Sequence, residues 1–503
     1  MTGRAFSLLR TMLHPVLSTL PFGAGRERSR LPVGPHHAVP AINLGGVILE
    51  RSAVSDVALA EAMYRGSFDF AGEHVSSLPD AVFSRAAPSN AWRVELLRFD
   101  WLASFRASPK SLHGLFALRL LSAWVSARPH YGSSQNQIAA LYNLAVDAPA
   151  IAATQSPAAI AIATAAILQA QQPVQRLKPD AADVALTRNM ALLAAHLATK
   201  RPDSQRSRLV QDLADSLQHA VGADGSHLTA GTAELHVLQE RLATLMRGLA
   251  VAGEQVHLRL AEVSSRIHSY LTLLARPDRS LAFVDGPALM LAADAPVRHG
   301  TALADTAGHA RLSGGKTLLL ANFGIVRESR SLQLEIHDGE QPLLWLQQAA
   351  HPGMGKREDC TLICAAGGSL LEIHSRSSDE ARQHLAIFLS GDGSDIRLEE
   401  KATDGVAPAY FLHVPDQARL STTHGGAGAM ILQNASSAWQ LLVRGGHVEL
   451  ENGMLRVTPG GPADSPLNFA LKRVSPAGRP ARNSKAIRVA TERAKADQSP
   501  RLL

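Results

Sequence analysis

The sequence predicts an α+β multidomain protein in which an α-helical domain precedes an antiparallel β-sandwich. Three observations support this fold class. The chain has 503 residues, which is too long for one ordinary hydrophobic core. Residues 51–276 carry apolar side chains at three- and four-residue spacing, the period of an amphipathic helix. Residues 277–473 form short apolar or alternating runs separated by Gly, Asp and Asn, as in an all-β sandwich.

The helical half divides at residues that favour turns. Helical spacing is clearest in LHGLFALRLLSAWVSA, DVALTRNMALLAAHLA, SRLVQDLADSLQHAV and AELHVLQERLATLMRGLAVAG. Turn-forming residues fall at 107–111, 127–134, 200–204 and 223–227. Long helices joined by such short loops predict antiparallel helix pairs.

The β half shows strand runs in succession with no helix between them, which predicts antiparallel sheets. The run ARPDRSLAFVDG, at 275–286, is expected to be the first strand. Later runs include KTLLLANFG, SLQLEIHDG, GSLLEIHSR and AWQLLVRGG.

The two ends of the chain differ from both halves. Residues 1–50 are predicted to form an extended or amphipathic lead-in, and 474–503 a basic disordered tail. The formal net charge of +6 comes from the segment 472–503, so the remainder is close to neutral. A nucleic-acid-associated protein that uses this tail is one hypothesis. No aromatic residues interleave its charges, so no specific nucleic-acid binding is expected.

The N-terminus does not decide the compartment. Its apolar stretch is interrupted by Arg10 and His14, which makes a poor secretory signal and favours the cytoplasm. No uncharged apolar run reaches about 18 residues, so no transmembrane segment is expected. Cys360 and Cys364, four apart in a strand, lie too far apart for a disulfide and are expected to be buried free thiols. No Cys/His pattern suggests a metal, and we expect neither metal nor cofactor.

A set of weak motifs in a consistent order resembles the heparinase II/III-like proteins. The segment 67–107 resembles their FxFxG turn, followed by a tryptophan and then F-x-W-L-x-x-(L/F)-R-A. The matching residues are Phe68, Phe70, Gly72, Trp92, Phe99, Trp101, Leu102, Arg106 and Ala107, then Arg119 and Trp124 in the next helix. GADGSHLTAG, with Asp224, Gly225 and His227, resembles the D-G-G-H segment of the family. RPDRSLAFVDG and HGTALADTAGHARLSGGKTLLLANFG resemble the strands that follow.

The resemblance implies an incomplete α/α toroid followed by a β-sandwich, with an acidic polysaccharide bound in the groove between the two domains. These lyases cleave uronic-acid-containing polysaccharides by β-elimination. The reaction needs a donor that neutralises the uronate carboxylate, a base for the C5 proton and an acid for the leaving oxygen. In the family an Asn neutralises the uronate carboxylate. A Tyr of the helical domain and a His of the sandwich serve as acid and base. The same resemblance favours the periplasm or cell envelope.

Three residues are the catalytic candidates. Asn189 stands where the neutralising Asn is expected, although it could be an ordinary polar helix residue. His227 belongs to the D-G motif, although a histidine in such a turn could simply cap the helix. His309, in AGHARL, replaces the usual aromatic residue and is expected to face the groove.

Two expected catalytic residues are missing from their places. The family Tyr falls near 232–235, where Glu234 and His236 are the only titratable residues. Arg327 or a near neighbour occupies the place of the sandwich His, and His337 at a strand end cannot replace it.

Five further residues are predicted to contact the substrate. Guanidinium groups pair bidentately with carboxylate or sulfate, which makes three arginines of the sandwich candidate ligands. The predicted substrate contacts are Arg311, Arg327, Arg330, Trp101 and Arg119.

Two functional hypotheses follow from the resemblance. The first is an active polysaccharide lyase, a carbon-oxygen lyase. The alternative is a catalytically degenerate protein that binds the same class of polymer. We expect Asn189 and His227 to converge within about 10 Å, the breadth of a small pocket, and the sandwich residues only partly. The polysaccharide, the oligomeric state and the metal dependence are not predicted.

Overall fold

The computed structural model describes most of the chain between residues 46 and 474. The described ranges are 46–50, 56–129, 132–179, 181–199, 203–255, 257–284, 288–291, 300–324, 332–349, 356–376, 382–402, 409–422, 426–434, 437–451, 453–460 and 466–474. The predicted tail, most of the predicted lead-in, and Arg327 and Arg330 lie outside these residues.

The chain divides into two compact units. The helical unit comprises 1–220 and 237–264, and the sandwich unit comprises 221–236 and 265–503. The sandwich unit therefore includes the turn near Asp224 and the end of the last helix, which a single boundary at 276 would assign to the helical part. The predicted domain limits stay a prediction.

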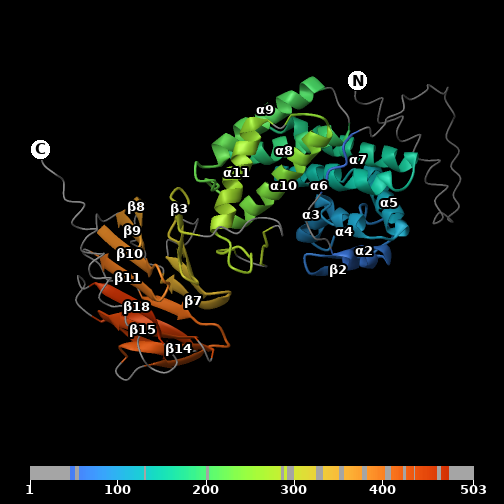
Figure 1. Ribbon diagram of the computed structural model, residues 1–503. Coiled ribbons are helices and arrows are strands. Elements are labelled where there is room, and N and C mark those ends of the chain that lie inside the picture. The colour runs from blue at the N-terminus through green and yellow to red at the C-terminus, as the bar shows by residue number, and fades with distance from the viewer. Residues whose placement is uncertain are drawn as a thin grey trace, which may run out of the picture. The chain divides into compact units, whose positions relative to one another are not determined.

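Ten described helices follow the helical periodicity of the first half (Figure 1). They are α2 (Val57–Tyr64), α3 (Asn90–Arg98), α4 (Leu102–Ala107), α5 (Ser111–Ala127), α6 (Ser134–Ala153), α7 (Pro157–Arg176), α8 (Ala182–Ala198), α9 (Asp203–Ala220), α10 (Thr232–Val251) and α11 (Leu258–Leu273). Serine hydroxyls cap several of them: Ser133 accepts from the Asn136 amide, and Ser156 from the Ala159 amide.

A small hairpin interrupts the predicted helical pattern. Strands β1 (Ser67–Phe70) and β2 (Glu73–Ser76) pair antiparallel around a two-residue turn. Ala71 and Gly72 both have positive φ, 50° and 75°, the geometry whose twist suits a tight hairpin. Phe68 and Phe70 are buried, so the FxFxG motif is a hairpin with one apolar face.

Two eight-stranded antiparallel sheets form the sandwich. The first has the order β16-β17-β12-β7-β6-β5-β4-β3, and the second β13-β14-β15-β18-β11-β10-β9-β8. The strands of the first sheet are β3 (Ala302–Ala304), β4 (His309–Gly314), β5 (Thr317–Asn322), β6 (Gln333–Asp338), β7 (Gln341–Gln348), β12 (Tyr410–His413), β16 (Gly446–Glu451) and β17 (Met454–Pro459). Those of the second are β8 (Lys356–Ala365), β9 (Gly368–Arg376), β10 (Arg382–Ser390), β11 (Asp395–Ala402), β13 (Arg419–Thr422), β14 (Gly428–Asn434), β15 (Ser437–Arg444) and β18 (Leu467–Val474).

Alternation along the strands builds the core between the two sheets. In β5, Leu319 and Ala321 join this core, while Leu318 and Leu320 pack with Ala282 on the opposite face. The same alternation places His309 and Arg311 of β4 on that opposite face, because His309 pairs with Asn322 and Arg311 with Leu320.

Two local predictions need correction. The run 275–286 is not a strand in its described part, which is a turn with isolated bridges, because side chains within it bond its own backbone. Both cysteines are free, as expected, but neither is buried, since they lie on β8 at the edge of its sheet.

Candidate functional site

A tight turn follows α9 and holds a carboxylate in place. The Gly222 amide donates to the Ser226 carbonyl at 2.8 Å, and Val221 bridges to His227. Asp224 Oδ1 accepts from the amide and the hydroxyl of Ser226 at 3.0 and 2.7 Å. Its Oδ2 accepts from the Ala307 amide at 3.3 Å, which ties the turn to the loop before β4.

These donors determine the charge state of Asp224. Burial alone would raise the pKa of its carboxyl group, but hydrogen bonds from Ser226, Ala307 and Thr306 outweigh it and hold the pKa below the ordinary value. Asp224 is therefore an anion at neutral pH.

Gly225 makes the turn possible. Its φ is +87°, and a Cβ at this position would lie 2.0 Å from the Arg266 carbonyl oxygen on α11. The turn thus packs directly against the backbone of α11, four residues before Tyr270.

A tyrosine–histidine pair lies beside this turn. The Tyr270 hydroxyl, on α11, is 3.0 Å from Nδ1 of His309, on β4. The rings meet edge to face with centroids 5.8 Å apart. Both are nearly buried, with 4% and 7% of their surface exposed. The Thr232 hydroxyl, at the start of α10, also bonds the tyrosine oxygen.

The surroundings keep Tyr270 protonated. Burial raises the pKa of its hydroxyl strongly, and the Asp224 charge adds to the rise, while the hydrogen bond from Thr232 opposes it. At neutral pH Tyr270 is therefore a neutral phenol, which can donate a proton.

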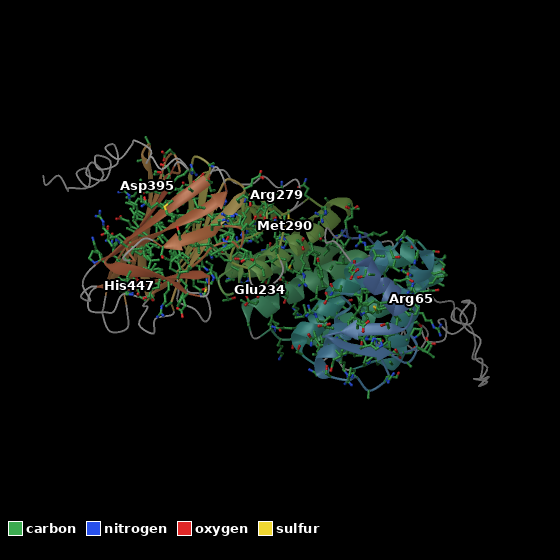
Figure 2. All side chains as sticks on the ribbon, turned by 90° about the horizontal axis from the view of Figure 1, so that it is seen from below. Arg65, Glu234, Arg279, Met290, Asp395 and His447 are labelled. Carbon is green, nitrogen blue, oxygen red and sulfur yellow. The ribbon has the colours of Figure 1, made fainter. Side chains whose placement is uncertain are left out.

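Phe283 covers the histidine. Its ring centroid is 5.6 Å from that of His309, at an interplanar angle of 31°. Its φ of +56° is unusual for a bulky residue, and such backbone strain persists only where neighbours enforce it. Figure 2 labels Arg279 and Met290; the amide of Leu291, the residue after Met290, donates to the Arg279 carbonyl at 3.0 Å.

The pair can perform acid–base chemistry through the two imidazole nitrogens. If Nδ1–H donates to the tyrosine oxygen, Nε2 carries the lone pair and can accept a proton. Tyr270 can then give its own proton to another group, because a hydroxyl donates and accepts at the same time.

Two other predicted residues of the sandwich unit bond to backbone. His227 Nδ1 accepts from the Ala230 amide at 2.9 Å, within the turn that precedes α10, so this bond is to the backbone of that turn and not to an amide of the helix itself. Arg311 donates to the carbonyls of Leu273 and Ala275 at the end of α11, the second at 2.7 Å. The roles of His227 and Arg311 at a substrate stay predictions.

The remaining described candidates lie in the helical unit. Asn189 is buried, and its amide group donates to the Asp212 carbonyl at 3.2 Å and the Ser216 hydroxyl at 3.0 Å. Trp101 is a core residue whose Nε1 donates to the Leu96 carbonyl. Arg119 forms a two-bond ion pair with Asp80. Because Asn189 and His227 belong to different units, their convergence stays a prediction.

Sequence reasoning named His309 but missed Tyr270. In SRIHSYLTLLARPD the tyrosine follows Ile267 by three residues and precedes Leu274 by four, so it belongs to the apolar stripe of the helix. Nothing local distinguishes it from a core residue. The residues described contain no group of three metal-ligating side chains, and no described helix is long and apolar enough to cross a membrane.

Comparison with known proteins finds similarity at the level of structure. No family model and no curated protein matches the sequence. A mutant of heparan sulfate lyase HepC from Pedobacter heparinus aligns over 94% of this chain and 89% of its own, with a TM-score of 0.62 and 10% identity. A heparinase III, the BT4657 gene product, gives a TM-score of 0.64 at 10% identity, covering 94% of this chain and 89% of its own. Another heparinase III gives 0.61 at 11% identity, with coverages of 94% and 90%. The chain therefore has the heparinase III fold, an incomplete α/α toroid followed by an antiparallel β-sandwich, and the predicted fold class is confirmed.

Proposed function

We propose that this protein is a polysaccharide lyase that cleaves uronic-acid-containing polymers by β-elimination, with Tyr270 and His309 as its proton-transfer pair. The observation that carries the proposal is the 3.0 Å contact between a buried phenol and an imidazole, on a fold shared with proteins described as heparan sulfate lyase and heparinase III.

In the proposed reaction His309 is the base. Its Nε2 takes the C5 proton of the uronate while Nδ1–H donates to the Tyr270 oxygen. The electrons of the C5–H bond form the C4=C5 double bond, and the bond from C4 to the glycosidic oxygen breaks. Tyr270 gives its proton to that oxygen, which leaves as a hydroxyl group.

The contact between the two side chains then resets the pair. After the elimination His309 is an imidazolium and Tyr270 a tyrosinate, and the Nδ1 proton passes to the Tyr270 oxygen across the 3.0 Å contact. His309 is then neutral with its proton on Nε2, and loss of that proton to water with return of one to Nδ1 restores the starting tautomer. The raised pKa of Tyr270 keeps the phenol protonated between turnovers, because its tyrosinate takes the imidazolium proton readily.

In this proposal Tyr270, from α11, serves in place of the tyrosine that is missing from α10. The expected position near 232–235 starts with Thr232, and the Thr232 hydroxyl bonds the Tyr270 oxygen. The nearness of Thr232 supports the proposal that the Tyr270 hydroxyl does the work expected of a tyrosine at 232–235. Asn189 remains the proposed neutraliser of the uronate, and it would exchange its bonds to Asp212 and Ser216 for the carboxylate.

The alternative is a binding protein that has lost catalysis. The 4% and 7% exposure of the two rings favours it, because a polymer reaches them only after Phe283 or another covering group moves.

The absorbance of the conjugated uronate tests the proposal. We would follow it during incubation with heparan sulfate, hyaluronan, alginate and polygalacturonate. Tyr270→Phe should lower the rate at least about 100-fold, the usual contribution of a positioned acid or base. Tyr142→Phe, at an equally buried tyrosine of the helical unit, is the matched control and should keep the rate. An unchanged rate in Tyr270→Phe would refute the assignment, and no absorbance change with the polymers still bound would favour the alternative.

A further inference from the structure

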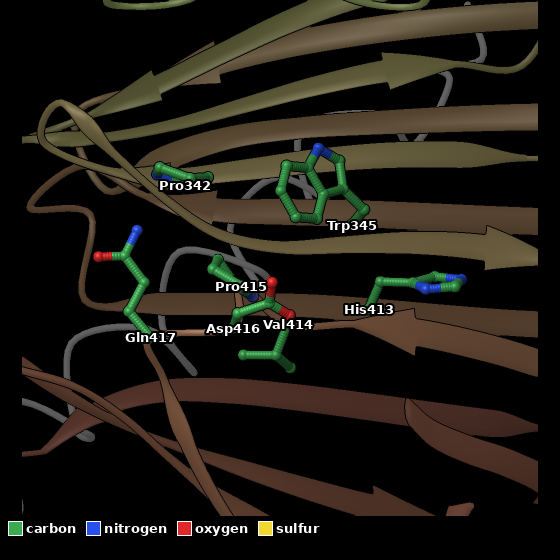
Figure 3. Close-up of a pocket in the computed structure, with 7 residues that line it drawn as sticks. All are labelled: Pro342, Trp345, His413, Val414, Pro415, Asp416 and Gln417. Carbon is green, nitrogen blue, oxygen red and sulfur yellow. The ribbon is translucent and has the colours of Figure 1, made fainter. Parts of the chain in front are cut away.

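A second polar and aromatic site lies on the sandwich, outside the Tyr270–His309 pair. An open pocket of about 630 Å³ is formed by β7 and the loop that follows β12 (Figure 3). Its lining consists of Pro342, Trp345, His413, Val414, Pro415, Asp416 and Gln417. Figure 3 shows the Trp345 indole between Pro342 and His413, with the 414–417 loop opposite.

Trp345 differs from the other tryptophans of the chain. The remaining four, Trp92, Trp101, Trp124 and Trp439, are at most 2% exposed. Trp345 is only half-buried, at a strand position whose side chain faces away from the sandwich core. A large apolar ring held open at a pocket is a surface to which a ligand can add contact area.

The chemistry around this ring suits a sugar. A sugar ring offers C–H groups on its faces and hydroxyls on its edge. The indole provides a flat apolar surface, while His413, Asp416 and Gln417 offer donors and acceptors at the rim. His413 lies directly opposite Trp345 in the register of β12 and β7, so the two rings belong to one row of the sheet.

The charge at the rim selects the class of sugar. Asp416 is exposed and brings a carboxylate to the pocket, which repels a uronate or a sulfate group and accepts hydrogen bonds from hydroxyl or N–H groups. We propose that this pocket binds an uncharged sugar, an N-acetylhexosamine or a neutral hexose, of the same polymer that the Tyr270–His309 pair cleaves. The second half of this statement rests on the proposed function.

The pocket and the Tyr270–His309 pair lie on the same face of the first sheet. Arg311 pairs with Leu320, Leu320 with Glu335 and Glu335 with Trp345, so pocket and pair share one face of the first sheet. Three strand spacings separate β4 from β7, roughly 14 Å at about 4.8 Å each. Between them, Glu335 is buried and paired bidentately with Arg276 at 2.7 Å, and Leu320 packs with Ala282, so the segment after α11 covers this part of the face.

Tryptophan fluorescence of the full chain tests the pocket without reference to catalysis. Since Trp345 is the least buried of the five tryptophans, a ligand there changes the emission mainly through this residue. We would titrate with a tetramer of N-acetylglucosamine and with a tetragalacturonate. The neutral oligomer should give a saturable change, and the acidic one at least tenfold weaker binding, a preference that Asp416→Asn should reduce.

Variants separate this proposal from the lyase assignment. Trp345→Ala should lower the affinity for the neutral oligomer at least tenfold, as measured by calorimetry. Tyr270→Phe should leave that affinity unchanged. Trp345→Ala should also raise KM for long polymers and leave kcat unchanged. If the neutral oligomer binds in a way that depends on Trp345 and no elimination product forms, the pocket proposal stands and the lyase proposal is refuted. No binding of the neutral oligomer, or equal binding by Trp345→Ala, overturns the pocket.

Discussion

Two turns of the sandwich unit have the same pattern of backbone hydrogen bonds but differ in the residues that their side chains contact. The first, 222–226, follows α9, and the second, 276–280, follows α11. In each, the first amide donates to the fifth carbonyl at 2.8 Å, and the fourth amide donates back to the first carbonyl at 3.1 and 2.9 Å. An isolated bridge closes each turn, and the fourth residue has a positive φ of 87° or 71°.

The side chains that build the two turns also match. Asp224 and Asp278 each accept from the amide and the hydroxyl of the serine two residues later. An Asp at the third position and a Ser at the fifth therefore stabilise both turns, because the Asp carboxylate bonds the turn's own backbone.

The other positions give the turns different tasks. The second carboxylate oxygen of Asp224 reaches the Ala307 amide, and its charge acts on Tyr270. In the second turn the first residue, Arg276, pairs with Glu335 of β6. The comparison shows that the same local turn can position a carboxylate beside the candidate site at 222–226 and anchor the chain to β6 at 276–280.

The largest effect is expected where the first turn packs against α11. Gly225→Ala should destabilise the protein by about 3 kcal/mol or more, because a positive φ is strained for alanine and the new Cβ would overlap the Arg266 carbonyl. Urea unfolding measures the change. A loss below about 1 kcal/mol would show that the turn can move away from α11.

The ion pair of the second turn should have the next largest effect. Arg276 and Glu335 are 23% and 7% exposed and make two bonds of 2.7 Å, so Arg276→Met or Glu335→Gln removes the ion-pair partner of a largely buried charge. We expect a loss of about 3 kcal/mol for either variant. Arg119→Met, which breaks the more exposed pair with Asp80, is the control and should cost less than about 1 kcal/mol. Equal losses would show that burial of the pair is unimportant.

Sequence patterns are sufficient to predict the long helices and the position of the first turn. The helices α5, α8 and α10 repeat apolar residues over 17 to 20 positions, a signal that tertiary contacts rarely overturn. The first turn was expected at 223–227 from its Asp-Gly-Ser composition. The second was taken for a strand, since Leu281, Ala282 and Phe283 form an apolar run and nothing in the run announces a positive φ at Arg279.

Of the two residues in the candidate pair, only His309 could be predicted from the sequence. His309 was identified from its place in a motif, but its partner lies 39 residues earlier on another element. A contact of this kind is produced by the packing of α11 beside β4, and no local spacing records it. The indole of Trp345 was missed for a similar reason, since its row is completed by His413, 68 positions later.

The Asp224 carboxylate should make the stability of the protein depend on pH. The pKa of Asp224 is lowered in the fold, so its stabilising effect is present above the ordinary value of about 4 and is lost as pH falls through the folded value. Asp224→Asn should be less stable than the unmodified protein by about 1 kcal/mol at pH 7, and this difference should vanish in acid. Thermal unfolding from pH 2 to 7 measures it.

Activity against pH distinguishes the tasks of the two carboxylates. The Asp224 charge raises the pKa of Tyr270, so Asp224→Asn should move the alkaline limb of the rate to lower pH. Asp278→Asn should lose the same kind of acid-dependent stability, since the pKa of Asp278 is also lowered, and leave that limb in place. Identical profiles for the two variants would contradict the separate roles.

The smallest effect is expected at the fourth position of the second turn. Arg279 holds a φ of 71°, which glycine adopts freely, so Arg279→Gly relieves backbone strain. The same change lets the unfolded chain gain entropy, which opposes the relief by roughly 0.5 to 1 kcal/mol. The two effects nearly cancel, and we expect the free energy of unfolding to change by less than about 1 kcal/mol in urea. A loss as large as that of Gly225→Ala would mean that the Arg279 side chain itself anchors the turn, and the likeness between the two turns would then end at their backbone bonds.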